Sequence, residues 1–176
     1  SRLKAKSLYG LLIHSTGDLL GPKGKKLIEA LNIVKLKGLA KKIGISVYDP
    51  IECERVMSLT RIDIVQAPLN IIDQRLVISG WLSRLNSEEI EVHARSAFLQ
   101  GLLLMSPENI PKSFQKWSKI FDQWSRSLKI NNLSATEVCL LYLLSIKEIN
   151  RVIVGVDSVL QLNELGFPCL LLVDQK

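Results

Sequence analysis

Short apolar runs of strand length recur along the chain and alternate with segments of helical periodicity. The runs cover residues 8–13, 43–45, 62–65, 90–92 and 151–154. Parallel strands in one sheet need a crossover connection, which a helix normally supplies. The alternation therefore predicts an α/β fold built on a parallel sheet.

Three segments carry the sequence signals of a helix start. Pro22 precedes a segment with apolar side chains at three- and four-residue spacing. Residues 49–52 (Asp-Pro-Ile-Glu) supply a capping side chain, a first-turn proline and a reciprocating carboxylate. Residues 134–137 (Ser-Ala-Thr-Glu) form a second capping box, and the residues 138–144 after it are apolar on most sides. We expect a helix after each signal, and we expect the third helix to pack against the sheet.

A longer insertion, residues 95–132, follows the fourth predicted strand. Pro107 and Pro111 predict a loop in this segment. An apolar stripe at helical spacing follows them, which favours a helix that contributes to the core over a ligand-binding box. The stripe consists of Phe114, Trp117, Ile120, Phe121 and Trp124.

The formal net charge of +6 raises the question of nucleic acid binding. The densest group of basic residues alternates with apolar residues. This pattern indicates the solvated face of a helix and argues against a nucleic acid partner. The group comprises Lys23, Lys25, Lys26, Lys35, Lys37, Lys41 and Lys42. With 47% hydrophobic and 23% charged residues, the chain has the composition of a folded protein.

Cysteine usage and hydropathy bear on the setting of the protein. Cys53, Cys139 and Cys169 are widely separated and odd in number, so they form neither a disulfide framework nor a metal-ligand pattern. This usage favours a reducing, cytoplasmic setting. No apolar run reaches the ~20 residues that cross a bilayer, so we expect a soluble protein that does not enter a membrane.

Polar residues or glycines stand where each of the five predicted strands ends. The carboxyl ends of parallel strands and the loops after them form the functional face of such folds. We therefore expect a ligand site at this face. The strand ends carry His14, Ser46, Gln66, Arg95 with Ser96, and Gly155 with Asp157.

Each of these residues also has a purely structural interpretation. His14 is as consistent with a hydrogen-bonded loop histidine as with a group that polarises a carbonyl. Ser46 is compatible with the start of a turn, Gln66 with a side-chain hydrogen bond that holds a loop in place, and Arg95 with an ion pair to a nearby carboxylate. Asp157 is compatible with the N-cap of a helix over residues 158–164.

Several familiar signatures are missing from the sequence. It contains no GxGxxG, GxxxxGK, CxxC, HExxH or GxSxG pattern, so a Rossmann dehydrogenase is not expected. The second histidine, His93, lies inside the fourth predicted strand, which favours a structural role. If the chain binds a dinucleotide, it does so with a fold other than the Rossmann fold.

The blocks around the strand ends resemble the aldo-keto reductase family in their order. Residues 9–15 (YGLLIHS), 42–48 (KIGISVY) and 62–70 (IDIVQAPLN) resemble the fourth, fifth and sixth barrel strands. Residues 92–103 (VHARSAFLQGLL) and 152–164 (VIVGVDSVLQLNE) resemble the seventh and eighth. The resemblance implies a partial (β/α)8 TIM barrel, in which parallel strands alternate with helices.

The resemblance also implies an oxidoreductase that transfers hydride between a nicotinamide cofactor, NAD or NADP, and a small carbonyl or alcohol substrate. His14 would be the catalytic histidine that orients and polarises the carbonyl. Ser46 and Gln66 would hold the nicotinamide carboxamide, and Arg95 would stack on the ring where the family commonly has tyrosine. Ser96 and Phe98 would lie along the pyrophosphate, and the adenosine half would be approached by Gly155, Asp157, Gln161 and Glu164.

Three positions depart from the family pattern. Val47 replaces an asparagine, so one hydrogen bond to the carboxamide is absent, and Ala97 replaces a common proline. Asp157 stands where many relatives that use the phosphorylated cofactor have a basic residue. A carboxylate there would repel the 2′-phosphate, which favours NAD over NADP.

The catalytic tyrosine of the family, with its lysine and aspartate partners, comes from earlier strands, and Tyr9, Tyr48 and Tyr142 do not match it. We therefore expect residues 1–176 to form a single aldo-keto reductase domain that lacks its N-terminal strands and is inactive alone. Open strand edges would then favour self-association. The alternative is a non-catalytic nucleotide-binding or interaction module of the same fold.

Overall fold

A five-stranded sheet forms the centre of the protein in a computed structural model, which describes residues 4–163 and residue 165. The strands lie in the order β1-β2-β3-β4-β5, and every neighbouring pair is parallel. The predicted alternation of parallel strands and helices is therefore confirmed. The strands are β1 (Leu8–Ile13), β2 (Ala40–Ser46), β3 (Ile64–Pro68), β4 (Glu91–Arg95) and β5 (Arg151–Val152).

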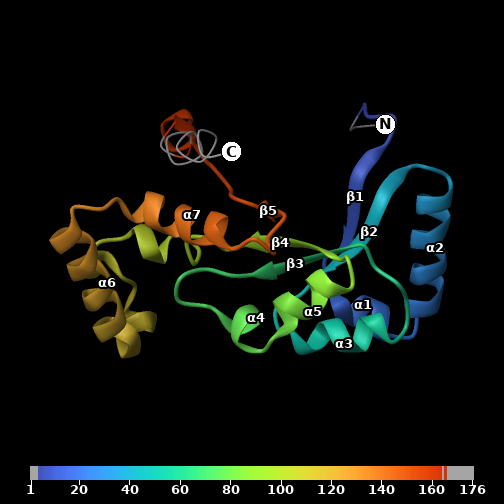
Figure 1. The fold of residues 1–176 in the computed structure, drawn as a ribbon, viewed down its shortest axis with the longest axis horizontal. Coiled ribbons are helices and arrows are strands. Elements are labelled where there is room, and N and C mark those ends of the chain that lie inside the picture. The colour runs from blue at the N-terminus through green and yellow to red at the C-terminus, as the bar shows by residue number, and fades with distance from the viewer. Residues whose placement is uncertain (1–3, 164, 166–176) are drawn as a thin grey trace.

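Helices connect the strands and extend the fold beyond them. Figure 1 shows α3, α4 and α5 along one side of the sheet, α2 next to β2, and α6 and α7 at the opposite end of the molecule. Three short 3-10 helices belong to the insertion after β4. The helices are α1 (Thr16–Leu20), α2 (Gly24–Leu36), α3 (Ile51–Met57), α4 (Arg75–Ile78), α5 (Trp81–Ser87), η1 (Leu102–Leu104), η2 (Pro107–Asn109), η3 (Lys112–Trp117), α6 (Ser118–Asn131) and α7 (Ala135–Ser145).

The predicted helix starts are confirmed. Before α3, the Asp49 carboxylate accepts a hydrogen bond from the Ile51 amide (3.0 Å), and the Glu52 carboxylate accepts one from the Asp49 amide (2.7 Å). Before α7, the Ser134 hydroxyl accepts from the Glu137 amide. Capping side chains thus satisfy helical amides that would otherwise lack an acceptor.

β1 matches its predicted run, β2 and β4 are longer than the predicted runs 43–45 and 90–92, and β3 and β5 also have different boundaries. β3 begins two residues later than expected, because the Asp63 carboxylate accepts hydrogen bonds from the Lys35 ammonium group and from the Ile43 amide. β5 is shorter than expected, although the Ile153 amide still donates to the Ala94 carbonyl (2.8 Å). Strand pairing against β4 therefore continues weakly beyond the two residues of β5.

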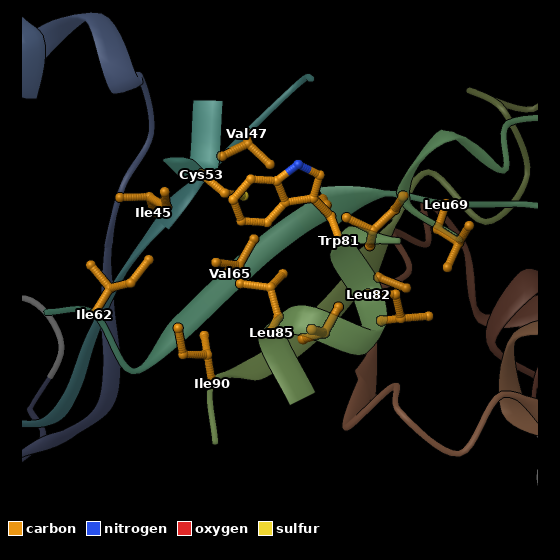
Figure 2. Packing of buried hydrophobic residues seen from close by; sticks show 14 of the residues in the cluster. Ile45, Val47, Cys53, Ile62, Val65, Leu69, Trp81, Leu82, Leu85 and Ile90 are labelled. Carbon is orange, nitrogen blue, oxygen red and sulfur yellow. The ribbon is translucent and has the colours of Figure 1, made fainter. Parts of the chain in front are cut away.

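The main core fills the space between the sheet and the helices α3 and α5 (Figure 2). Ile45 in β2, Val47 directly after β2, and Val65 in β3 point toward Trp81 and Leu85 of α5. Side chains alternate along a strand, so the intervening residues face the other way. We call that second side the inner face, and it carries Lys42, Gly44, Ser46, Gln66, Glu91, His93 and Arg95.

A second, smaller core lies under the insertion. Leu102, Leu103 and Cys139 surround Phe121 of α6, and the Trp124 indole donates to the Leu103 carbonyl (2.9 Å). The predicted apolar stripe is thus buried only in part. Trp117 and Ile120 are 41% and 42% exposed, because α6 packs on short 3-10 turns that cover only one side of it.

The third predicted helix, α7, packs as expected on its inward side. Leu143 joins the main core and Cys139 the smaller one, whereas Leu144 is exposed. Cys53 is buried in the main core, so the two described cysteines lie in different clusters. Cys169 lies outside the described residues.

The predicted solvated helix face is confirmed only for part of the basic group, because Lys41 and Lys42 lie in β2 and Lys42 pairs with Glu91. Along α2 the side chains of Lys25, Lys26 and Lys35 are exposed, whereas Leu31 is buried against the sheet. Across residues 4–163, no helix combines the length and the apolar character that a membrane span requires.

Candidate functional site

Ser46 and Gln66 are register partners; Ser46 is the last residue of β2, whereas Gln66 lies two residues before the end of β3, which continues beyond the predicted strand end. Ser46 is only 3% exposed, and its hydroxyl oxygen is buried without a hydrogen-bond partner among the described residues. His14 follows Ile13, which pairs with Ile45, so His14 lies at the level of Ser46. The three residues therefore form one row.

Arg95 ends β4 and reaches over β3 to the end of β2. Its Nη2 atom donates to the Val47 carbonyl (3.0 Å), and its guanidinium lies over the Tyr48 ring, 4.5 Å from the centroid. Its Nη1 atom lies 3.3 Å from the Ser96 hydroxyl, and its Nε is buried without a partner. The sequence-based alternative of an ion pair is wrong within the described part of the chain, because a carbonyl and an aromatic ring hold the guanidinium instead.

Val47 and Asn70 support this end of the sheet. The Val47 side chain is completely buried in the main core, so Val47 contributes to the site through its carbonyl, which accepts from Arg95. Asn70 is also fully buried; its Nδ2 donates to the Ser96 carbonyl (3.1 Å), and its Oδ1 accepts from the amides of Ile72 and Asp73. Asn70 thus ties the loop after β3 to the loop after β4.

The loop after β4 has an uncommon backbone. Ser96, Leu99 and Gln100 have φ angles of 62°, 48° and 55°, in the left-handed region that disfavours side-chain-bearing residues. Such residues persist only where the surrounding structure enforces them, and they concentrate at ligand sites. The loop is therefore a candidate ligand-binding segment.

A cavity of about 420 Å³ opens between this loop and the segment after β5. Five residues predicted from the sequence line it together, although up to 65 positions separate them along the chain. They are Ser96, Phe98, Gly155, Asp157 and Gln161. Thr136, near the start of α7, lines the cavity as well.

The segment after β5 is organised by side-chain hydrogen bonds. The Gln161 side chain accepts from the Asp157 amide (2.7 Å), and the Ser158 hydroxyl accepts from the Gln161 amide (3.2 Å). Ser158 therefore caps the helical residues 159–163, and the alternative of Asp157 as N-cap is wrong. The Asp157 side chain is exposed beside the cavity. Glu164, the other residue predicted here, lies outside the described residues.

His14 belongs to a different hollow. It is exposed and lines a space of about 620 Å³ together with Asp18, Lys23 and Lys26. His93 is buried inside β4, as the sequence predicts, with its Nε2 atom 3.2 Å from Glu91. The structure therefore does not bring His14 into the cavity that gathers the other predicted residues.

A separate polar cluster occupies the amino end of the inner face. Glu91 accepts hydrogen bonds from the Tyr9 hydroxyl and the Lys42 ammonium group, both at 2.6 Å. Burial tends to raise the pKa of Glu91, but the combined hydrogen bonds from Lys42, Tyr9 and His93 outweigh it and lower that pKa to about 2. The same pairing raises the pKa of Lys42. This cluster is saturated with internal partners.

Sequence reasoning missed three residues at the carboxyl end. Tyr48 stacks on Arg95, Thr136 reaches the cavity from α7, and Asn70 supports Ser96. Asn70 stands in a block that resembles a strand of the family. The sequence therefore drew attention to its position but did not indicate its role. Nothing local to Tyr48 or Thr136 indicates their contacts, because both depend on how distant segments pack.

The profile of the Aldo/keto reductase family matches residues 20–175 of the chain. A search of curated proteins finds no match. The fold is similar to that of the aldo-keto reductase AKR11C1 from Bacillus halodurans in its holo form, with a TM-score of 0.71 and 20% identity. That alignment covers 95% of this chain and 57% of the other chain.

Two further solved structures are similar. The thermostable aldo-keto reductase Tm1743, solved in complex with the inhibitor epalrestat, has a TM-score of 0.68 and 19% identity over 96% of this chain and 56% of its own. The glycerol dehydrogenase AKR11B4 from Gluconobacter oxydans has a TM-score of 0.62 and 18% identity over 86% and 50%. This chain thus spans little more than half the length of these proteins. The likeness confirms the predicted partial (β/α)8 barrel.

Proposed function

Because this chain belongs to the aldo/keto reductase family, we propose that it binds a nicotinamide dinucleotide at the carboxyl end of its sheet and serves the oxidoreduction of a small carbonyl or alcohol substrate. The observation that carries the proposal is the cavity of about 420 Å³ that gathers five residues predicted from the sequence. A cavity of this size suits part of an extended ligand, with the remainder lying along the strand ends.

The polar atoms at the end of β2 fit the nicotinamide end of such a cofactor. The Ser46 hydroxyl is buried and has no partner in the part of the chain that the structure describes, and a buried polar group without a partner is costly unless a ligand satisfies it. Gln66 stands next to it in register and offers both a donor and an acceptor. In this proposal the two side chains hold the carboxamide and so determine which face of the ring meets the substrate.

The loops after β4 and β5 fit the remaining parts of the cofactor. Ser96 and Phe98 would lie along the pyrophosphate, with Gly155, Asp157 and Gln161 on the adenosine side. The exposed Asp157 carboxylate would repel a 2′-phosphate and accept a hydrogen bond from a ribose hydroxyl, which favours NAD over NADP.

His14 is the residue of this chain that we assign to the substrate. His14 follows β1 at the level of Ser46, and its exposed imidazole would turn from the hollow it shares with Lys23 toward the strand ends, donate a hydrogen bond to a carbonyl oxygen and orient that group. The bound cofactor supplies hydride for reduction of the carbonyl carbon. A substrate carbonyl would then lie between His14 and the ring held by Ser46.

Titration of the 176-residue chain with NADH and NADPH, followed by cofactor fluorescence, tests the proposal. We expect saturable binding with NADH preferred, and we expect Ser46→Ala to weaken NADH binding about tenfold, the equivalent of one lost hydrogen bond of 1.4 kcal/mol. Arg84→Gln, which alters α5 on the helix side of the sheet, is the matched control and should leave binding unchanged. An absence of saturable binding at millimolar concentrations of both cofactors would refute the proposal.

A further inference from the structure

Arg95 is a half-buried cation without a carboxylate partner among the described residues. Its Nε is buried and unpaired, and its hydrogen bonds go to the neutral Val47 carbonyl and Ser96 hydroxyl. Arg84 offers a contrast, because it stacks on Trp81 at 4.3 Å yet also lies 3.0 Å from Glu88. Arg95 makes the same kind of aromatic contact, but no carboxylate among the described residues lies within ion-pair distance of its guanidinium.

The nearest acid does not neutralise Arg95. Asp73 forms a bidentate contact with Arg75, at 2.9 Å and 2.8 Å. The hydrogen bonds from Arg75, more than the charge of Arg95, lower the pKa of Asp73, so this carboxylate is already engaged. An uncompensated guanidinium in a partly buried position interacts strongly with any charge placed beside it, because little water screens it.

The guanidinium lies next to the position assigned to the nicotinamide ring. By the alternation along their strands, Ser46 and Arg95 both start from the inner face, and the Arg95 guanidinium donates to the carbonyl of Val47, the residue that follows Ser46. A ring whose carboxamide is held by Ser46 and Gln66 therefore lies against the guanidinium. This step rests on the proposed function.

We propose that Arg95 makes the site bind reduced nicotinamide cofactor more tightly than oxidised cofactor. The oxidised ring carries a positive charge, and the reduced ring is neutral, while the rest of the two molecules is identical. Two unit charges about 4 Å apart repel enough to change a binding constant roughly fivefold in water and far more in a protein-like medium. Arg95 is thus a specificity-determining residue for the oxidation state of the ligand.

This preference has a consequence for cofactor exchange. In a mixture of both forms, reduced cofactor would occupy the site, and oxidised cofactor would leave it readily.

Isothermal titration calorimetry of the full chain with NADH and NAD+ at low ionic strength tests the inference. We expect the ratio of the two dissociation constants, oxidised over reduced, to be about 10 or more in the wild type. Arg95→Gln should lower this ratio at least fivefold, and Arg95→Lys, which keeps the charge, should preserve most of it. Arg84→Gln, the stacked but ion-paired arginine, should leave the ratio unchanged.

Ionic strength provides a second measurement on the wild type. Both cofactor forms carry the same pyrophosphate, so its salt dependence cancels in the ratio, and a charge effect of Arg95 should make the ratio fall as salt is added. A ratio near one, a ratio independent of salt, or an unchanged ratio in a folded Arg95→Gln variant would overturn the inference while leaving the proposed function intact. Failure of the wild type to bind NADH would overturn both.

Discussion

The two ends of the inner face use polar side chains in opposite ways. At the amino end, Glu91 has partners in Tyr9, Lys42 and His93, which come from three different strands. At the carboxyl end, Ser46 and Arg95 each bury a polar atom that no described residue satisfies. Both ends belong to the same strands: Lys42 and Ser46 are four residues apart along β2, and Glu91 and Arg95 are four residues apart along β4.

The contrast separates stability from binding. A polar network whose members satisfy one another rigidifies the structure that contains it, whereas unsatisfied buried groups destabilise the free protein and favour a ligand that pairs with them. We therefore expect changes at the amino end to affect unfolding and changes at the carboxyl end to affect cofactor binding.

A substitution midway between the two ends should have the largest effect, because it disturbs both. A Cβ atom at Gly44 would lie 2.1 Å from the Ile64 carbonyl oxygen, so Gly44→Ala forces β2 away from β3. We expect a loss of about 3 kcal/mol in the free energy of unfolding, measured by urea denaturation, together with a loss of NADH binding.

Gly17→Ala is the control for this change. It lies in α1, where the added methyl group would meet only the Ser15 hydroxyl at 3.4 Å, and alanine favours a helix over glycine. Gly17→Ala should therefore unfold at the same or slightly higher urea concentration. A Gly44→Ala protein as stable as the wild type would show that the two strands have room to separate.

Glu91→Gln should have the next largest effect, and it should be confined to the amino end. The free energy of unfolding should fall by about 2 kcal/mol at pH 7, because Lys42 loses its carboxylate partner. The folded-state pKa of Glu91, about 2, lies below the ordinary value of 4.5, so its contribution is complete above pH 4.5 and disappears as the pH falls toward 2. The stability difference between the two proteins should follow this course in urea denaturation.

Lys35→Gln removes a lysine–carboxylate pair that is more exposed than the Lys42–Glu91 pair. It should cost less than about 0.5 kcal/mol. Both variants should bind NADH as the wild type does. A constant stability difference from pH 7 to pH 2.5 between Glu91→Gln and the wild type would argue against the low pKa and against the saturated network.

The order of elements was predictable from the sequence because its signals are local. The capping box at residues 49–52 involves neighbours within three positions, and the alternation of apolar residues within each strand needs no knowledge of the partner strand. The exposed Trp117 and Ile120 were not predictable in the same way. A helical stripe indicates which side of α6 is apolar, but the extent of the surface that covers it depends on the packing of distant segments.

The candidate site was predictable in its members and not in their contacts. Strand ends converge in any parallel sheet, so Ser46, Gln66 and Arg95 could be named together. The sequence could not show that Arg75 engages Asp73, which leaves Arg95 to contact the Val47 carbonyl and the Tyr48 ring. Nor does it show that His14 lines a separate hollow. These features depend on distances between side chains that only the folded chain defines.

Ser46→Ala should not lower stability at all, which tests the comparison at the carboxyl end. Its hydroxyl has no partner among the described residues, so its removal relieves a buried unsatisfied group and leaves a methyl group that the tightly packed strand end tolerates. We expect the free energy of unfolding to stay constant or to rise by up to about 1 kcal/mol, although the NADH dissociation constant increases.

The pair of measurements distinguishes the two ends of the sheet. Glu91→Gln should lose stability and keep binding, and Ser46→Ala should keep stability and lose binding, although both replace one polar group on the same face. A loss of more than about 1 kcal/mol in Ser46→Ala would mean that its hydroxyl has a partner within the folded chain. The carboxyl end would then be as saturated as the amino end, and the argument that its unsatisfied groups mark a ligand site would fail.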